Sequence, residues 1–270
     1  MPKSLPYISL RLPLLFSVFI SSMVFNTNAI EIDKTASQKV TLNKNIIPAF
    51  KATYAISRQA KELGEATRKL VYLDDGLAQY SYHTDLKWLI FSDTRTETSV
   101  IKLHGNKVTP ISYEFIRKGT GRNKHYKWRY DIANNTAINE INPRTKTIEF
   151  PDNIQDPLSY HLQHRLNMIS KPAQDLYVYP VIKTSGSIKN YVYQYDGEEE
   201  LILPDGLIKT LKFKREVIEK KRITYIWFAP ELDYLLVKLH QIKGGVEQFK
   251  ATLKSVSPLD ATNTTQTNKK

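Results

Sequence analysis

Alternation of apolar and polar residues with a period of two runs through most of this sequence, and it restricts the possible fold more than any other feature. The clearest case is residues 125–132, which read HYKWRYDI. In an extended strand one face would carry Tyr126, Trp128, Tyr130 and Ile132, and the other His125, Lys127, Arg129 and Asp131. A helix would scatter the same aromatic residues around its circumference, so the pattern predicts a half-buried β-strand.

The same period recurs in further segments, which are separated by residues typical of turns. Strands are predicted at residues 50–56, 66–73, 77–84, 96–103, 111–117, 125–132, 145–150, 177–184, 188–195, 199–203, 207–217, 222–228, 234–242 and 246–254. Turns are predicted at sequences such as Gly119-Thr120-Gly121, Asp196-Gly197 and Gly244-Gly245, which accommodate positive φ angles. Because these connections are short, successive strands are expected to pair antiparallel.

One segment departs from this period and predicts a helix over residues 156–169. Asp156 stands where an N-cap is expected, and Pro157 occupies the first helical position. The apolar positions Leu158, Leu162 and Leu166 then recur at helical spacing. An isolated helix of this length is marginal in water, so its apolar face is expected to pack on the sheet and its polar face to lie in solvent.

The ordered part of the chain is predicted to be one domain. The chain has 270 residues, which is enough for a large buried core. We predict an antiparallel β domain at residues 46–257 and a disordered tail at residues 258–270, which is rich in Thr and Asn. The predicted fold is mostly β, a single large and strongly curved antiparallel sheet or open barrel with one packed amphipathic helix. A two-sheet β-sandwich is the alternative.

The first residues of the chain predict export. Lys3 and Arg11 precede an apolar run that extends to Phe25, and Ala29 offers a small residue for cleavage. This pattern is typical of a signal peptide, here residues 1–29, followed by a flexible leader at residues 30–45. The chain contains no cysteine, so neither a disulfide nor the lipid-bearing cysteine of a bacterial lipoprotein is expected. The predicted location is the periplasm, with no membrane span after cleavage.

The chain is basic, with a formal net charge of +12. Outside the cytoplasm the natural polyanions are lipid head groups and acidic surface polymers, so nucleic acid is not an expected partner. Six basic residues flank the turn at 119–121 and are candidates for contact with an anionic surface: Arg117, Lys118, Arg122, Lys124, Lys127 and Arg129. The alternative is a charged outer face that discourages aggregation at a sheet edge.

Aromatic residues are numerous, with 16 Tyr, 10 Phe and 3 Trp. Those in the alternating strands are candidates for the wall of a ligand cavity, because tyrosine combines a flat apolar ring with a polar tip. The candidate ligand-binding residues are Tyr80, Tyr82, Tyr126, Trp128, Tyr130, Tyr191 and Tyr193. The alternative is that these rings fill a solid core.

No arrangement of residues predicts a catalytic or metal site. His161 and His164 lie three residues apart, as two metal ligands on a helix would, but no cysteine or nearby acid completes a set, and solvated histidines are the simpler interpretation. Ser159 lacks the glycine pattern that surrounds a nucleophilic serine. The paired acids that a glycan hydrolase needs could come from Asp93 with Glu97 or from Glu198-Glu199-Glu200, both of which we interpret as solvated residues. No cofactor is predicted.

Several short motifs resemble those of a known family. They are Phe50-Lys51-Ala52-Thr53-Tyr54, Gly64, Pro110-Ile111-Ser112-Tyr113, Asp156-Pro157-Leu158-Ser159, Trp227-Phe228-Ala229-Pro230 and Asp233-Tyr234-Leu235-Leu236-Val237-Lys238-Leu239. In order and spacing they resemble the exported bacterial proteins grouped as domain of unknown function 3108, over residues 47–255. Leu236 departs from the family, in which proline is expected, and this bears on a local turn. The resemblance implies an exported protein of Gram-negative bacteria with an extended, curved antiparallel sheet, and it implies no activity.

These observations favour a non-enzymatic periplasmic binding or carrier protein for a lipid-like or amphiphilic envelope molecule. The alternative is an envelope scaffold that has a solid core and binds another protein, and a glycan hydrolase is third. The aromatic residues distinguish the first two hypotheses. Tyr80, Tyr126 and Tyr193 would be packed without a pocket in a scaffold, and they would border a cavity in a carrier.

Overall fold

The computed structural model describes residues 46–88, 90–172 and 174–259. The predicted signal peptide, the leader and the tail from residue 260 onward lie outside the described residues. In the part of the chain that the structure describes, no helix is both long and apolar enough to cross a membrane.

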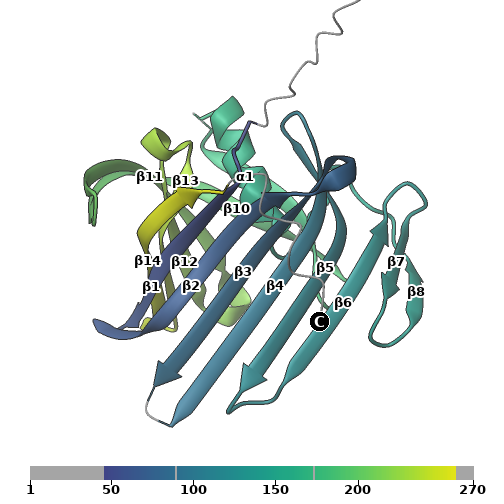
Figure 1. Cartoon of the computed structure of the whole chain (residues 1–270), viewed down its shortest axis with the longest axis horizontal. Helices are drawn as coiled ribbons and strands as arrows, with labels where there is room; N and C mark the ends of the chain where they lie inside the picture. Colours follow the sequence, from purple (N-terminus) through teal and green to yellow (C-terminus); the bar gives the residue numbers. More distant parts are fainter. Residues whose placement is uncertain (1–45, 89, 173, 260–270) are drawn as a thin grey trace, which may run out of the picture. The chain divides into compact units, whose positions relative to one another are not determined.

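The described residues form one antiparallel sheet of fourteen strands, which confirms the predicted fold class and not the sandwich (Figure 1). The strands are β1 (Phe50–Arg58), β2 (Lys61–Tyr72), β3 (Leu77–Trp88), β4 (Phe91–His104), β5 (Lys107–Gly119), β6 (Lys124–Asp131), β7 (Thr136–Asn139), β8 (Arg144–Thr147), β9 (Leu176–Ile182), β10 (Ile188–Leu203), β11 (Gly206–Val217), β12 (Arg222–Ala229), β13 (Leu235–Lys243) and β14 (Val246–Pro258). Short 3-10 turns lie at Asp74–Gly76, Ile218–Lys220 and Pro230–Leu232.

The strand order joins two runs of hairpins through the first and last strands. It reads β8-β7-β6-β5-β4-β3-β2-β1-β14-β13-β12-β11-β10-β9. Tyr54 of β1 lies opposite Leu253 of β14, and both side chains are buried. The backbone N–H of Leu259 donates to the carbonyl oxygen of Ala49 at 3.0 Å. The two ends of the domain therefore meet in the middle of the sheet, and β8 and β9 form its edges.

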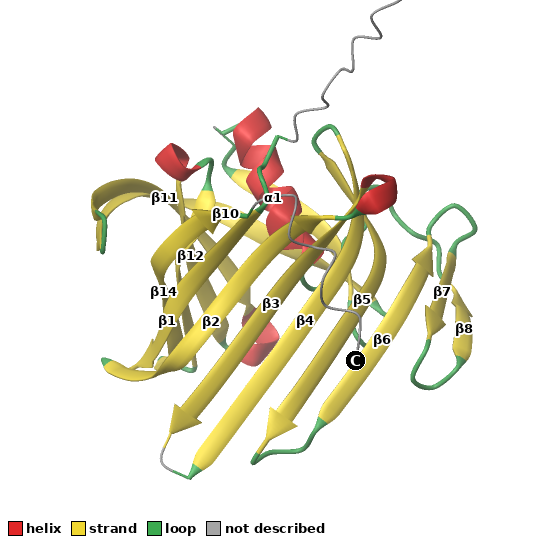
Figure 2. Ribbon diagram, viewed as in Figure 1, coloured by secondary structure: helices red, strands yellow, loops and turns green. Residues whose placement is uncertain are grey.

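Helix α1 (Ser159–Ser170) lies inside the curve of the sheet, between the front and back strands (Figure 2). It begins three residues later than predicted, and the carboxylate of Asp156 accepts hydrogen bonds from the backbone N–H groups of Leu158 at 2.8 Å and Ser159 at 2.7 Å. The prediction of a solvated polar face was wrong, because the side chains of Gln163, His164 and Arg165 are buried. A helix enclosed by a curved sheet meets protein on several sides, so it has no fully solvated face.

Residues before the helix connect the edge strand β9 to the other half of the sheet. The backbone N–H of Gln155 donates to the carbonyl oxygen of Pro180, and its own carbonyl oxygen accepts from Ile182, both at 2.9 Å. The side-chain amide of Gln155 donates to the carbonyl oxygen of Val108 in β5 at 2.9 Å. The indole of Trp128 in β6 donates to the carbonyl oxygen of Thr184 at 3.1 Å. Isolated contacts, rather than a strand ladder, therefore join the region of edge strand β9 to strands β5 and β6.

Most predicted strands are present, and two local differences have physical causes. In β6 the alternation holds, with Trp128 and Tyr130 buried and Arg129 exposed. The predicted turn at Asp196-Gly197 is instead an irregularity within the continuous strand β10, where the register shifts between Tyr195 and Glu198 and Gly197 has φ 103°. A bulge and a turn both favour glycine with positive φ, so the sequence did not distinguish them. Strand β7 was not predicted because its four residues are too few to show a period.

Candidate functional site

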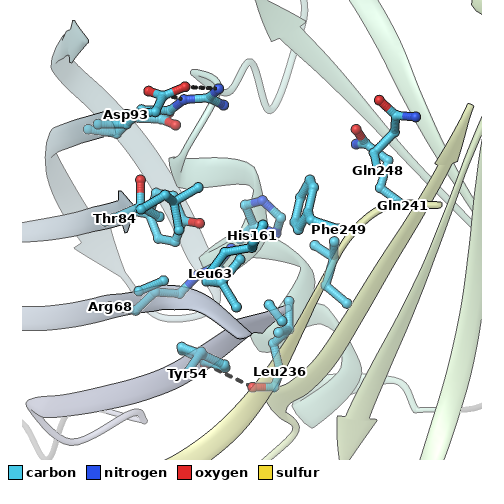
Figure 3. A pocket seen from close by; sticks show the side chains of 18 of the residues that line it. Tyr54, Leu63, Arg68, Thr84, Asp93, His161, Leu236, Gln241, Gln248 and Phe249 are labelled. Atoms are coloured by element: carbon cyan, nitrogen blue, oxygen red, sulfur yellow. Dashed lines mark hydrogen bonds and ion pairs between the residues drawn. The ribbon is translucent and has the colours of Figure 1, made fainter. Parts of the chain in front are cut away.

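A cavity of about 610 Å³ lies between the inner face of the sheet and the start of α1. Its wall comes from β1 to β4 on one side and from β12 to β14 on the other, and His161 contributes from the helix. Figure 3 shows Tyr54, Leu63, Arg68, His161, Leu236 and Phe249 around this space. Further apolar lining comes from Ile56, Ala66, Leu86, Leu158, Leu239 and Ala251. The wall combines these apolar side chains with charged and amide side chains, among them Arg68, Glu97 and Gln241.

Strand β2 places a charged side chain inside this cavity. Its buried residues alternate as Ala66, Arg68 and Leu70, so Arg68 occupies an inward position between two apolar ones. Only 7 % of Arg68 is exposed. An arginine keeps its charge in a protein, so β2 introduces a permanent cation on the inner face of the sheet.

The contacts of Arg68 are few for a buried arginine. Its Nη1 donates to the Oη of Tyr80 at 3.2 Å, and its guanidinium lies 5.4 Å from the centre of the Tyr82 ring. No ion pair among the described residues includes Arg68. The buried Arg165 of α1 differs, because it donates to the carbonyl oxygens of Asp233 at 2.7 Å and Leu232 at 3.1 Å. Arg165 is held by backbone, whereas Arg68 has only a phenol oxygen.

Two acids of β4 line the cavity and have different surroundings. Burial raises the pKa of Glu97, although its carboxylate accepts a hydrogen bond from the Oη of Tyr113 at 2.7 Å. Burial alone would also raise the pKa of Asp93, but hydrogen bonds from Arg95 and Arg117 lower it. Since four residues of a strand span about 13 Å, the backbones of Asp93 and Glu97 lie farther apart than paired catalytic carboxylates require. This separation disfavours the hydrolase hypothesis.

The histidines of α1 are not the solvated residues that the sequence suggested. His164 is buried among Tyr177, Tyr193 and other rings, its Nδ1 lies 2.8 Å from the Oη of Tyr179, and burial lowers its pKa to about 3. His161 lines the cavity, and burial followed by the charge of Arg68 lowers its pKa well below the usual range. Among the described residues, no group of three or more His, Asp or Glu side chains could hold a metal.

Ser159 is committed to structural hydrogen bonds. Its Oγ donates to the side-chain oxygen of Gln155 and accepts from the backbone N–H of Asp156, both at 2.9 Å. The residue is fully buried. These contacts give it the capping role expected of a serine at the start of a helix.

A second pocket, of about 420 Å³, shares Arg95, Glu97 and Pro157 with the main cavity. It extends toward β5, β6, β10 and β11, and its walls are mostly tyrosine and basic residues. Arg215 lies 3.5 Å from the centre of the Tyr191 ring. The remaining members are Tyr113, Phe115, Arg117, Lys124, Tyr126, Tyr160 and Thr184. The main cavity therefore has a polar neighbour.

The structure separates the candidate aromatic residues into two groups. Tyr82 lines the main cavity, and Tyr126 and Tyr191 line the second pocket. The other four, Tyr80, Trp128, Tyr130 and Tyr193, are buried in the core. The test that separates a carrier from a scaffold therefore gives a mixed result, because Tyr80 and Tyr193 are packed while Tyr126 borders a pocket.

The six candidate basic residues do not form one free surface. Arg117 pairs with Asp93 at 3.0 Å. Lys127 and Arg129 both pair with Glu140, at 3.3 and 3.1 Å. The other three, Lys118, Arg122 and Lys124, are exposed. The acidic run at 198–200 is also engaged, since the carboxylate of Glu199 accepts from Lys212 and Trp227.

Sequence reasoning missed Arg68, Arg165 and the cavity role of His161. A signal for Arg68 was available, because an inward position of an alternating strand rarely carries a charge. No comparable signal exists for Arg165 or His161, since their burial depends on the sheet closing around α1.

Thr84 offers a test of the cavity wall. Its Oγ1 is buried and has no hydrogen-bond partner in the described part of the chain, and the residue lines the cavity. Replacing an unsatisfied buried hydroxyl by a methyl group removes a desolvation penalty. We expect Thr84→Val to raise the free energy of unfolding by about 1 kcal/mol in chemical denaturation. The exposed Thr145→Val is the control, and equal effects of the two substitutions would contradict the assignment.

The comparisons with known proteins agree with this architecture. The family model for proteins of unknown function designated DUF3108 matches residues 53–254. The chain belongs to this family. A crystal structure of a β-barrel-like protein of domain of unknown function DUF1849 from Brucella abortus is similar, with a TM-score of 0.55 and 8 % identity. The match covers 79 % of this chain and 99 % of that one, and it shows the likeness of fold alone. A comparison with curated protein sequences found no significant match.

Proposed function

We propose that this DUF3108 protein is a non-enzymatic periplasmic carrier that binds an amphiphilic envelope molecule inside its curved sheet. The observation that carries the proposal is the cavity of about 610 Å³, whose wall combines apolar side chains with the buried cation of Arg68. Its volume falls within the range of about 300 to 1,000 Å³ that is typical of small-molecule sites. The periplasmic location is proposed from the basic and apolar pattern of residues 1–29.

The arrangement of polar groups supports an amphiphile over a wholly apolar ligand. A purely apolar ligand would leave Arg68 and Glu97 desolvated and without compensation. The apolar half of the wall, with Leu239 and Phe249, suits an acyl or similar chain. The polar second pocket could receive a head group beyond the shared residues Arg95 and Glu97.

Native mass spectrometry of the protein, purified under mild conditions from the envelope of its host, tests the proposal. We expect a bound amphiphile that is released on denaturation. Leu239→Trp places a large ring in the cavity wall and should reduce the bound fraction at least about fivefold, because cavity volume limits the ligand. Leu207→Trp is the matched control, since Leu207 is 64 % exposed. Ligand-free wild-type protein, or equal occupancy in both variants, would refute the carrier function.

A specific observation also favours the scaffold as a second candidate. Leu176, Val178 and Val192 are about half exposed on β9 and β10, and Val178 lies opposite Val192 in the register. An exposed apolar strip at a sheet edge is a common docking surface for another protein. Crosslinking in cells from a residue of this strip tests the scaffold function. Capture of one dominant protein partner would support it. Purification of the protein without any bound ligand would be consistent with the scaffold function and not with the carrier function.

A further inference from the structure

Among the residues that the structure describes, no acidic side chain forms an ion pair with Arg68, the inward cation of β2. Moving a charge out of water is costly unless hydrogen bonds and an opposite charge compensate. Arg68 has one phenol oxygen at 3.2 Å and the face of one ring. Arg165 donates to two carbonyl oxygens, although its Nη1 lacks a partner among the described residues, whereas Arg68 donates to no carbonyl or carboxylate oxygen. The contacts that a buried arginine needs are therefore incomplete at Arg68.

The charged residues that line the cavity favour the binding of a negatively charged group. Four arginines line it, Arg58, Arg68, Arg95 and Arg222, against the acids Asp93 and Glu97. Asp93 is held by Arg95 and Arg117. Glu97 accepts a hydrogen bond from Tyr113 and forms no ion pair with Arg68. The cavity therefore carries an excess of positive charge.

The apolar surroundings restrict what that negative group can be attached to. Tyr54 and Arg68 lie on one side of the space and Phe249 of β14 on another (Figure 3). Ala66, Tyr82 and Leu239 also line the cavity. A small inorganic anion would leave this apolar space unfilled. A single-chain amphiphile would occupy both parts of the cavity.

We propose that Arg68 binds the acidic group of a single-chain amphiphile, a carboxylate or a phosphate monoester, whose chain lies against Leu239 and Phe249. This proposal rests on the carrier function and adds the chemical class of the ligand. The planar guanidinium matches either oxyanion with two parallel hydrogen bonds.

Isothermal titration calorimetry with three ligands of equal chain length tests the proposal on the delipidated full chain. The ligands are dodecanoate, dodecyl phosphate and dodecanol. One charge-assisted contact corresponds to about tenfold in affinity or more, so the wild type should bind at least one of the acids at least about tenfold more tightly than the alcohol. The stronger of the two acids identifies the oxyanion.

Three variants distinguish a role of Arg68 in ligand binding from a role in stabilising the fold. Arg68→Met should bind acid and alcohol equally, and Arg68→Lys should keep part of the preference because it keeps the charge. Lys69→Met should behave as the wild type, because Lys69 is an exposed residue of the same strand and does not line the cavity. If Arg68→Met does not fold, Arg68→Lys and the selectivity of the wild type decide.

The outcomes distinguish this inference from the carrier function. Equal affinity of the wild type for acids and alcohol would overturn the role of Arg68 and leave the carrier intact. Acid preference that survives in Arg68→Met would overturn it as well. Absence of binding by all three ligands would count against the carrier function itself.

Discussion

Substitution of Asp156 by alanine is expected to lower the free energy of unfolding by about 3 to 5 kcal/mol. The residue is fully buried, and its carboxylate accepts hydrogen bonds from the backbone N–H groups of Leu158 and Ser159 and from the hydroxyl of Ser99. Alanine would leave these donors without an acceptor at the start of α1. Because Ser99 belongs to β4, the substitution would loosen the helix and its attachment to the sheet together. Chemical denaturation followed by circular dichroism measures the loss.

Two further substitutions control this measurement. Asp156→Asn retains one oxygen for the backbone donors, so we expect it to lose less than about 1.5 kcal/mol. Asp152→Ala removes an exposed acid a few residues away and should change stability by less than about 0.5 kcal/mol. A loss in Asp156→Ala no larger than that in Asp152→Ala would show that the carboxylate does not hold the helix.

The same carboxylate should make stability depend on pH. Burial raises the pKa of Asp156 to about 6, against the opposing hydrogen bonds from Ser99, Ser159 and Leu158. Between about pH 4 and 6 the folded state then binds more protons than the unfolded state. The contribution of Asp156 to the free energy of unfolding therefore falls as pH rises. His161 and His164 act oppositely over the same range, because burial lowers their pKa values.

The comparison with Asp156→Asn isolates the contribution of the carboxylate. A pKa difference of about two corresponds to about 3 kcal/mol, so the variant should gain stability relative to the wild type by up to this amount between pH 4 and 7. Denaturation curves of both proteins across this range measure the difference. If the difference in the free energy of unfolding between the two proteins did not change with pH, this result would contradict the raised pKa of Asp156.

The second large effect is expected from Gly64→Ala, which should lower the free energy of unfolding by at least about 3 kcal/mol. Gly64 has φ 145°, a conformation that side chains rarely adopt, and a Cβ atom there would overlap the carbonyl oxygen of Asp85 in β3. Gly64 lies opposite Ile56, where the pairing of β1 with β2 shifts register and Leu63 of β2 has no partner in the ladder. Strands β2 and β3 would have to move apart to admit the methyl group.

Gly105→Ala is the matched control in the turn between β4 and β5. Gly105 also has a positive φ, 58°, but no atom lies within 4 Å of the position that its Cβ would take. This substitution should therefore lower the free energy of unfolding by about 1 kcal/mol only. If both variants lost the same free energy of unfolding, the close packing of strands at Gly64 would not contribute to stability. The measurement is the same denaturation experiment.

The sequence predicted the strands because each strand of a half-buried sheet shows its own alternation of apolar and polar residues. Residues 125–132 show this most clearly, and β6 has the predicted faces. The order of the strands could not be predicted, since nothing within β1 or β14 indicates that they pair. The helix was also located from its own leucines, but the burial of His164 and Arg165 depends on strands more than ten residues away along the chain.

The site was less predictable than the fold. The alternation of β2 does place Arg68 between Ala66 and Leu70, so a sequence argument can assign it to the inner face. Whether a carboxylate meets it there depends on β4, whose Asp93 and Glu97 are instead held by Arg117 and Tyr113. Aromatic side chains serve equally well in a core and in a cavity wall, which is why Tyr80 and Tyr126 have different environments.

The pairing of β1 with β14 has a consequence for how the chain folds during synthesis. Among the described strands, the one that a ribosome releases last lies beside the one that it releases first, and their paired residues are about 200 positions apart. Forming such contacts requires closing a very long loop, which slows folding. The two hairpin runs can form earlier, but they stay separate halves until β14 joins them. Loss of the last thirteen-residue strand would therefore divide the sheet at its centre, whereas loss of the short edge strand β8 would only shorten it.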